Sequence, residues 1–147
     1  MSQSATDELQ ATVNIVEETY EFCLAYAAKG VSGLMARTGD TQVRDQLEKL
    51  AQALPNLADV FLKVVHENEG DGQEQYKGFI EVLRRDAEAG HAAVSLVLAQ
   101  ENITSQMVDN LNGMIHLRAL LTDVFLIDEM LRPEAEQPLH ILSLIHI

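Results

Sequence analysis

Apolar residues recur along most of this chain at alternating steps of four and three positions. In the first segment that shows the pattern they are Leu9, Val13, Val16, Tyr20, Cys23 and Ala27. This spacing places them on one face of an α-helix. Asp7 and Glu8 suit the positive end of a helix dipole, and Gly30 is typical of a helix end. We therefore expect a first helix that opens near Ser4 or Thr6 and stops at Gly30.

A second segment keeps the same rhythm over three heptads. Its apolar positions are Val43, Leu47, Leu50, Leu54, Leu57, Phe61 and Val64. Pro55 falls inside this run, where it removes a backbone donor and crowds the preceding turn. Because the apolar stripe keeps its register on both sides of the proline, the pattern predicts one kinked helix that begins at Asp40 or Thr41. An acidic loop at residues 68–72 follows it.

Two further segments complete the pattern. The third runs from about Gln73 to Leu98. The fourth begins after a cap at Thr104 or Ser105 and continues to Leu131. No segment alternates with a period of two, so the sequence predicts no strand. Four helices joined by short connections predict an all-α fold, an antiparallel up-down-up-down four-helix bundle whose second helix is kinked at the internal proline.

The fourth segment is apolar around most of its circumference. Twelve of the eighteen residues from Met114 to Leu131 are apolar. A helix of this kind is usually buried on several sides, and a bundle of four helices covers only part of it. We expect a second subunit to cover the rest, with a missing C-terminal element as the alternative. The predicted interface residues are Leu117, Leu120, Val124, Ile127 and Leu131.

The last six residues, 142–147, read Leu-Ser-Leu-Ile-His-Ile. They resemble the translation of the transposon-end adaptor that is used in sequencing libraries. We expect these residues to be adaptor read-through and the natural chain to continue past about Ile141. The predicted organisation is a bundle domain at 1–133, a polar linker or truncated element at 134–141, and the adaptor-derived tail.

The chain is 147 residues long and strongly acidic, with 10 Lys and Arg against 23 Asp and Glu and a formal net charge of −13. This balance argues against nucleic acid or an anionic membrane as a partner, because both require clustered basic residues. A hydrophobic fraction of 47% is too high for a disordered acidic chain. With one cysteine, no secretory signal and no membrane-spanning run, we expect a protein of the reducing cytoplasm.

Glu88 and His91 form the strongest metal-binding pattern in the chain. A Glu and a His three positions apart lie on one helix face, as in ferritin-like di-iron bundles. The surrounding stretch resembles the metal-binding helix of that superfamily, which implies iron as the cofactor and Glu17 or Glu18 as a further ligand. The sequence departs from the family because it has no second Glu-x-x-His pair. The alternative is a surface pair without a metal.

Other candidate groups fit a structural role. His116 lies seven positions from both Asp109 and Asp123, which predicts one shared face on a continuous helix. The acidic loop at 67–72 lacks the glutamate that a calcium loop requires at its twelfth position. Cys23 lies on the apolar stripe, and we interpret it as a small buried hydrophobe.

No complete catalytic constellation is present in these patterns. The leading hypothesis is a non-catalytic interaction or regulatory protein, without a cofactor, that self-associates through its fourth helix and binds a protein partner of unknown kind. The competing hypothesis is a ferritin-like metal-binding bundle that uses the Glu-x-x-His pair. Neither hypothesis assigns a catalytic residue.

Overall fold

The computed structural model describes residues 2–30, 41–69 and 74–131, and these contain five helices and no strand. The helices are α1 (Ser2–Ala28), α3 (Thr41–Glu69), α4 (Glu74–Leu98), α5 (Ser105–Gly113) and α6 (Ile115–Leu131). The prediction of an all-α fold is therefore confirmed. The linker predicted at 134–141 and the tail at 142–147 lie outside the described residues.

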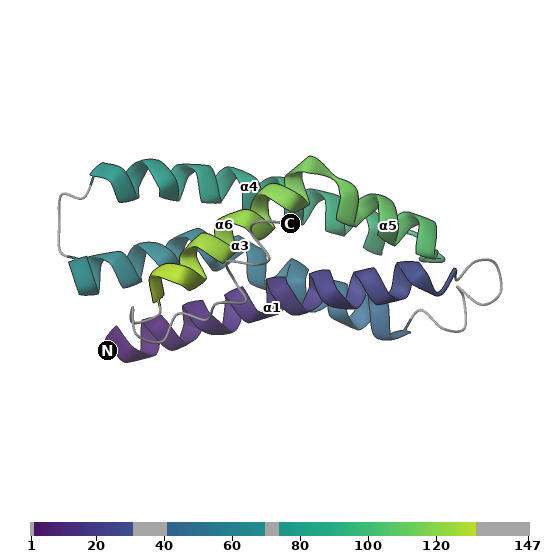
Figure 1. The fold of residues 1–147 in the computed structure, drawn as a ribbon, viewed down its shortest axis with the longest axis horizontal. Helices are drawn as coiled ribbons and strands as arrows, with labels where there is room; N and C mark the ends of the chain where they lie inside the picture. The colour runs from purple at the N-terminus through teal and green to yellow at the C-terminus, as the bar shows by residue number, and fades with distance from the viewer. Residues whose placement is uncertain (1, 31–40, 70–73, 132–147) are drawn as a thin grey trace.

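The helices lie side by side along the long axis of the molecule (Figure 1). α1 and α4 run in one direction along this axis, and α3, α5 and α6 run in the opposite direction. α3 packs between α1 and α4, whereas α6 packs against both α1 and α4 from the other side. The space between these helices holds the apolar core.

The apolar stripes identified from the sequence form this core. The twelve largest fully buried side chains are Leu9, Val13, Val43, Leu47, Leu50, Leu54, Leu57, Leu83, Val94, Ile103, Leu120 and Ile127. Every helix of the described residues contributes buried side chains to this cluster. The four-three rhythm therefore correctly predicted which faces of α1 and α3 point inward.

Helix α3 continues without a break through Pro55. The proline is exposed, while Leu54 and Leu57 on either side of it are buried. The unbroken apolar register around the proline correctly predicted one element rather than two. The kink predicted at this position stays a prediction.

The prediction of one fourth helix from 105 to 131 is wrong. The chain leaves the helix at Met114, with φ −68° and ψ 140°, and α6 begins at Ile115. The preceding residues Asn110, Asn112 and Gly113 are weak helix formers. At about 100° per residue, an unbroken helix would also turn the buried face of α5 away from that of α6 by roughly a third of a turn. The break restores a common inward face.

Side-chain hydrogen bonds hold the connection between α4 and α5. Thr104 caps α5, because its hydroxyl oxygen accepts a bond from the N–H of Met107 at 3.1 Å, as the sequence predicted. The Tyr26 hydroxyl donates to the carbonyl of Ile103 at 2.7 Å, and the Ser105 hydroxyl donates to the carbonyl of Tyr26 at 2.7 Å. This reciprocal pair joins the end of α1 to the start of α5.

Gly90 is the point at which α4 closely approaches α6. A Cβ atom at this position would lie 3.2 Å from Cδ2 of Leu120 and 3.6 Å from Cδ1 of Leu54. Contact at 3.2 Å is tighter than most packed side chains tolerate, and the two leucines are fully buried. The absence of a side chain at Gly90 therefore sets the separation of α4 and α6.

Replacing Gly90 with valine is expected to lower the free energy of unfolding by about 1–3 kcal/mol, since the added methyl groups overpack the contact with Leu120. The matched control is Gly78→Val on the same helix, where nothing lies within 4 Å of an added Cβ. Gly78→Val is expected to be neutral or slightly stabilising, because valine is a better helix former than glycine. Urea unfolding curves of both variants test the prediction; equal stabilities would contradict it.

Candidate functional site

A pair of carboxyl groups lies between α4 and α6, at Asp86 and Asp123. The two groups are within hydrogen-bonding reach of each other. Burial first, and then the neighbouring Asp86 carboxyl, raise the pKa of Asp123 from an ordinary 3.8 to about 8. Both causes disfavour a second negative charge at this place. The contact therefore favours the protonated form of Asp123.

The position of this pair follows from the close approach at Gly90. Asp86 lies one helical turn before Gly90 on α4, and Asp123 lies one turn after Leu120 on α6. Because α4 and α6 run in opposite directions, these two turns face each other (Figure 1). The fold thus brings together two acidic side chains that no sequence motif links.

The predicted metal ligands do not converge. On α4, Glu88 is exposed and His91 is half-buried; on α1, Glu17 is half-buried and Glu18 is exposed. Helices α1 and α4 are not a closely packed pair in the described part of the chain. Within residues 2–30, 41–69 and 74–131, no group of three or more His, Cys, Asp or Glu side chains is arranged to hold a metal ion. Iron binding through the Glu-x-x-His pair stays a prediction.

Three of the five predicted interface residues belong to the core of the chain itself. Leu120, Val124 and Ile127 are fully buried against the other helices, and Leu117 and Leu131 are half-buried and pack on the same core. These side chains are therefore not an exposed surface of the single chain. Self-association through this helix stays a prediction, but it requires other residues.

The exposed apolar residues of the same region lie on the opposite side of α6. Ile115 is 80% exposed, Leu126 is 52% exposed and Met130 is 47% exposed. Met114, at the break between α5 and α6, is also exposed. The sequence predicts that this helix is apolar on several sides, but the residues predicted to contact a partner lie on its inward face. The 3.6-residue periodicity alone does not say which of two apolar faces points inward.

Asp109 does not share a face with His116 and Asp123, which was predicted for all three residues. The break at Met114 separates Asp109 on α5 from the other two residues on α6, and both His116 and Asp109 are exposed. Asn112, which is buried, instead donates a hydrogen bond to the carbonyl of Tyr20 at 3.3 Å. These residues therefore have separate places in the fold.

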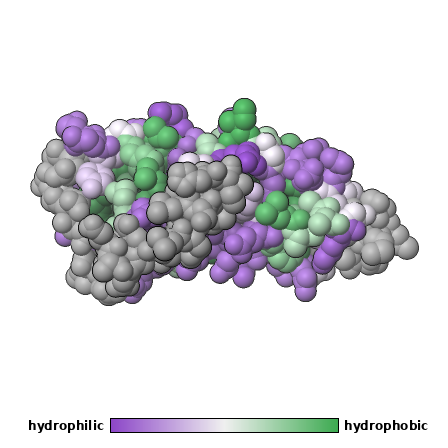
Figure 2. Space-filling model, viewed as in Figure 1, coloured by the Kyte–Doolittle hydropathy of each residue, from purple (hydrophilic) through white to green (hydrophobic). Residues whose placement is uncertain are grey.

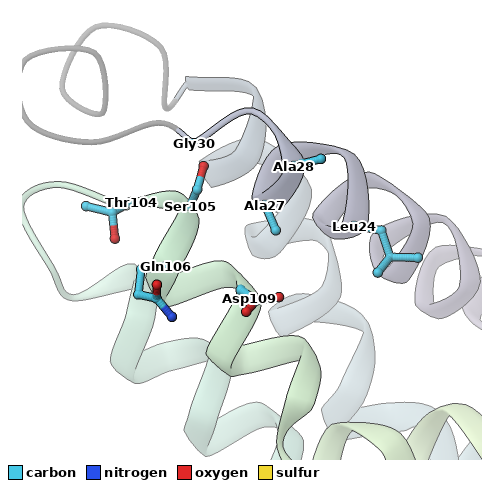
Figure 3. A pocket seen from close by; sticks show the side chains of 8 residues that line it. All are labelled: Leu24, Ala27, Ala28, Gly30, Thr104, Ser105, Gln106 and Asp109. Atoms are coloured by element: carbon cyan, nitrogen blue, oxygen red, sulfur yellow. The ribbon is translucent and has the colours of Figure 1, made fainter.

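A cleft lies between the end of α1 and the start of α5 (Figure 3). Its lining residues are Leu24, Ala27, Ala28, Gly30, Thr104, Ser105, Gln106 and Asp109. The two hydroxyl groups in it are engaged in the helix cap and in the bond to the carbonyl of Tyr26. The cleft therefore presents few polar groups that are free to bind a ligand.

A small internal cavity of about 20 Å³ borders Cys23, Leu117 and Leu121. This volume is about that of one water molecule and is too small for an organic ligand. Cys23 is 1% exposed, and burial raises the pKa of its thiol to about 12. Its interpretation as a buried hydrophobe is confirmed, and the thiol is unreactive in the closed fold.

Comparison with known proteins adds no family to this description. No protein-family model, no curated protein and no solved structure matches the chain. Among the helices of the described residues, none has the length and apolar character that crossing a membrane requires. The function is therefore argued from the geometry of the chain itself.

Proposed function

We propose that this chain is a non-catalytic interaction protein of the cytoplasm that self-associates through the outward face of α6. In this proposal the helices form an antiparallel four-helix bundle in which α5 and α6 together are the fourth member. The outward stripe consists of Ile115, Ala119, Thr122, Leu126 and Met130. The observation that carries the proposal is the exposure of the large apolar side chains in this stripe.

The exposed residues follow the spacing of a helix face. Steps of four, three, four and four positions place the outward stripe along one side of α6. The buried residues Leu120, Val124 and Ile127 lie on the opposite side. Figure 2 shows hydrophobic atoms projecting from the upper edge of the molecule near its middle. Met114 and Ile115, at the break between α5 and α6, are both exposed. Contiguous exposed apolar side chains of this kind favour a protein contact.

A second copy of the chain suits this stripe because its pattern is self-complementary. In an antiparallel pairing of two α6 helices about a two-fold axis, Ile115 lies opposite Met130 of the other copy. Ala119 then lies opposite Leu126, so that a small residue meets a large one, and Thr122 lies at the centre. A two-fold interface requires one surface to match itself in this way. The stripe also has no charged residue, which reduces repulsion between two acidic chains.

Substituting Leu126 with aspartate is expected to convert a dimer into a monomer, since it would bury an unpaired charge at the contact. Light scattering at micromolar concentration measures the mass, which should correspond to two chains before the substitution and one after it. The matched control is Leu24→Asp on α1, because Leu24 is 49% exposed and Leu126 is 52% exposed. Circular dichroism should show an intact helical fold in both variants.

Two outcomes with the full-length chain would contradict the proposal. One is a monomeric mass for the unsubstituted chain, and the other is a dimer that Leu24→Asp dissociates as effectively as Leu126→Asp. The same measurement on a chain that ends at Ile141 removes the adaptor-like residues 142–147. Dimerisation that depends on those six residues would also count against the outward stripe.

A further inference from the structure

In the facing carboxyl groups of Asp86 and Asp123, one oxygen atom can accept a hydrogen bond but has no hydrogen-bond donor beside it. The Oδ2 atom of Asp123 is buried and receives no hydrogen bond from any described residue. A buried carboxylate oxygen normally accepts bonds from backbone or side-chain donors. Here the neighbouring group is a second carboxyl, which becomes a donor only when the pair carries a proton. The unpartnered oxygen of Asp123 at the contact between α4 and α6 therefore favours a proton on the pair.

We propose that this pair makes the docking of α6 onto α4 proton-dependent, so that closing the contact takes up one proton and a rise in pH loosens it. The proposal concerns a single chain and does not depend on self-association. When α6 is docked, one proton bridges Asp86 and Asp123. When α6 separates from α4, water solvates both carboxyl groups and the bridging proton is released.

The direction of the effect follows from the two environments of Asp123. In the docked state the pKa of Asp123 is about 8, and in a solvated state the ordinary value is 3.8. Between these values the docked state binds one proton more than the separated state. The stability of the docked state relative to the separated state therefore falls as pH rises through this interval, and it does not fall further above about pH 8.

No basic side chain is among the causes of the pKa shift of Asp123. Asp86 is the ionisable group that faces Asp123 from α4, and burial and Asp86 are the causes of the shift. Arg84 on α4 points elsewhere, because it binds Asp59 of α3 at 3.1 Å. α5 carries one ionisable group, the exposed Asp109. α1 carries no basic side chain; its charged groups are the carboxylates of Asp7, Glu8, Glu17, Glu18 and Glu21.

Cys23 supplies a probe of this separation. It is the single cysteine of the chain, it is 1% exposed, and it borders a cavity with Leu117 and Leu121 of α6. Movement of α6 away from the core therefore admits a thiol reagent. The rate of alkylation by iodoacetamide, measured where α6 redocks faster than the reagent reacts, is proportional to the equilibrium constant for opening.

The decisive experiment compares the alkylation rate of the unsubstituted chain with that of Asp123→Asn from pH 5 to pH 9. Dividing the two rates at each pH cancels the pH dependence of the thiol itself. The ratio is expected to rise about tenfold per pH unit between roughly pH 5 and 7.5, and to level off above about pH 8. Asparagine has the shape of a protonated aspartate and needs no proton to donate to Asp86.

Two further variants keep the result interpretable. Asp86→Asn should behave as Asp123→Asn does, and it provides the test if Asp123→Asn does not fold. The matched control is Asp45→Asn, which makes the same change of charge at an exposed position on α3. Its alkylation rate should follow that of the unsubstituted chain at every pH. A ratio that stays constant between pH 5 and pH 9 for both pair variants would overturn the proposal.

Hydrogen exchange of backbone amides separates local from global opening. The pH-dependent difference between the unsubstituted chain and Asp123→Asn should be confined to peptides from α6 and its contacts with α4. Equal differences in α3 peptides that contain Leu47 or Leu57 would show that the proton acts only on complete unfolding. That result would overturn the claim of a proton-dependent contact.

Discussion

Replacing Leu120 with alanine is expected to lower the free energy of unfolding by about 2–5 kcal/mol, the range for a leucine truncated in a rigid core. Leu120 is 0% exposed, and its Cδ2 atom is the closest neighbour of Gly90. Truncation removes this contact between α4 and α6 and leaves a cavity that the helices fill incompletely. Urea unfolding followed by circular dichroism measures the loss.

Leu126→Ala is the matched control, on the same helix and with the same change of side chain. Leu126 is 52% exposed, so its truncation should change the stability of the single chain by less than about 0.5 kcal/mol. The comparison is made at a concentration at which the chain is monomeric, because association would add stability to the unsubstituted protein. Similar decreases in the free energy of unfolding for Leu120→Ala and Leu126→Ala would mean that α6 does not have the inward and outward faces described.

These two leucines show how far the sequence determines the fold. Helices α1 and α3 each have one main apolar stripe, so their periodicity alone identified the buried face. α6 is apolar on two sides, and periodicity cannot rank two apolar faces. The choice between Leu120 and Leu126 depends on how α6 sits against α1 and α4, which is tertiary information.

The break before α6 had a signal in the sequence. Val108 and Leu111 in α5 and Leu120 and Val124 in α6 are all buried. In one unbroken helix these two pairs would point in directions that differ by nearly half a turn. A change of phase together with Gly113 predicts an interruption, whereas a count of apolar residues does not.

The carboxyl pair, by contrast, had no signal in the sequence. Asp86 and Asp123 are far apart along the chain and belong to no spacing motif, whereas Glu88 and His91 match a known spacing. Spacing rules apply within one helix, but the aspartate pair arises from the register between two antiparallel helices. That register is set by Gly90 and Leu120, whose contact is visible only in the folded chain.

Arg44 fastens the end of α4 to α3, and Arg44→Met is expected to lower the free energy of unfolding by about 2–3 kcal/mol. Its guanidinium donates to the carbonyls of Leu98, Gln100 and Glu101, at 2.9, 3.1 and 3.3 Å. Leu98 is the last residue of α4 and Gln100 and Glu101 follow it in the connection to α5, so the guanidinium lies at a helix C-terminus, where unpaired carbonyls attract a cation. Methionine retains most of the side-chain length but leaves these carbonyls without the donors and without the charge.

Two substitutions separate the guanidinium from its surroundings. Arg44→Lys keeps the charge but cannot reproduce a planar group that reaches three acceptors. The decrease in its free energy of unfolding should therefore be smaller than that of Arg44→Met. Lys49→Met removes a cation from an exposed position on the same helix and should change stability by less than about 0.5 kcal/mol. Urea unfolding ranks the three variants. If Lys49→Met lowered the free energy of unfolding as much as Arg44→Met, the destabilisation would come from the net charge of an acidic chain and not from the contacts of Arg44. If Arg44→Lys retained full stability, the charge at the helix end would be sufficient, and the fork of hydrogen bonds to the α4–α5 connection would contribute nothing measurable.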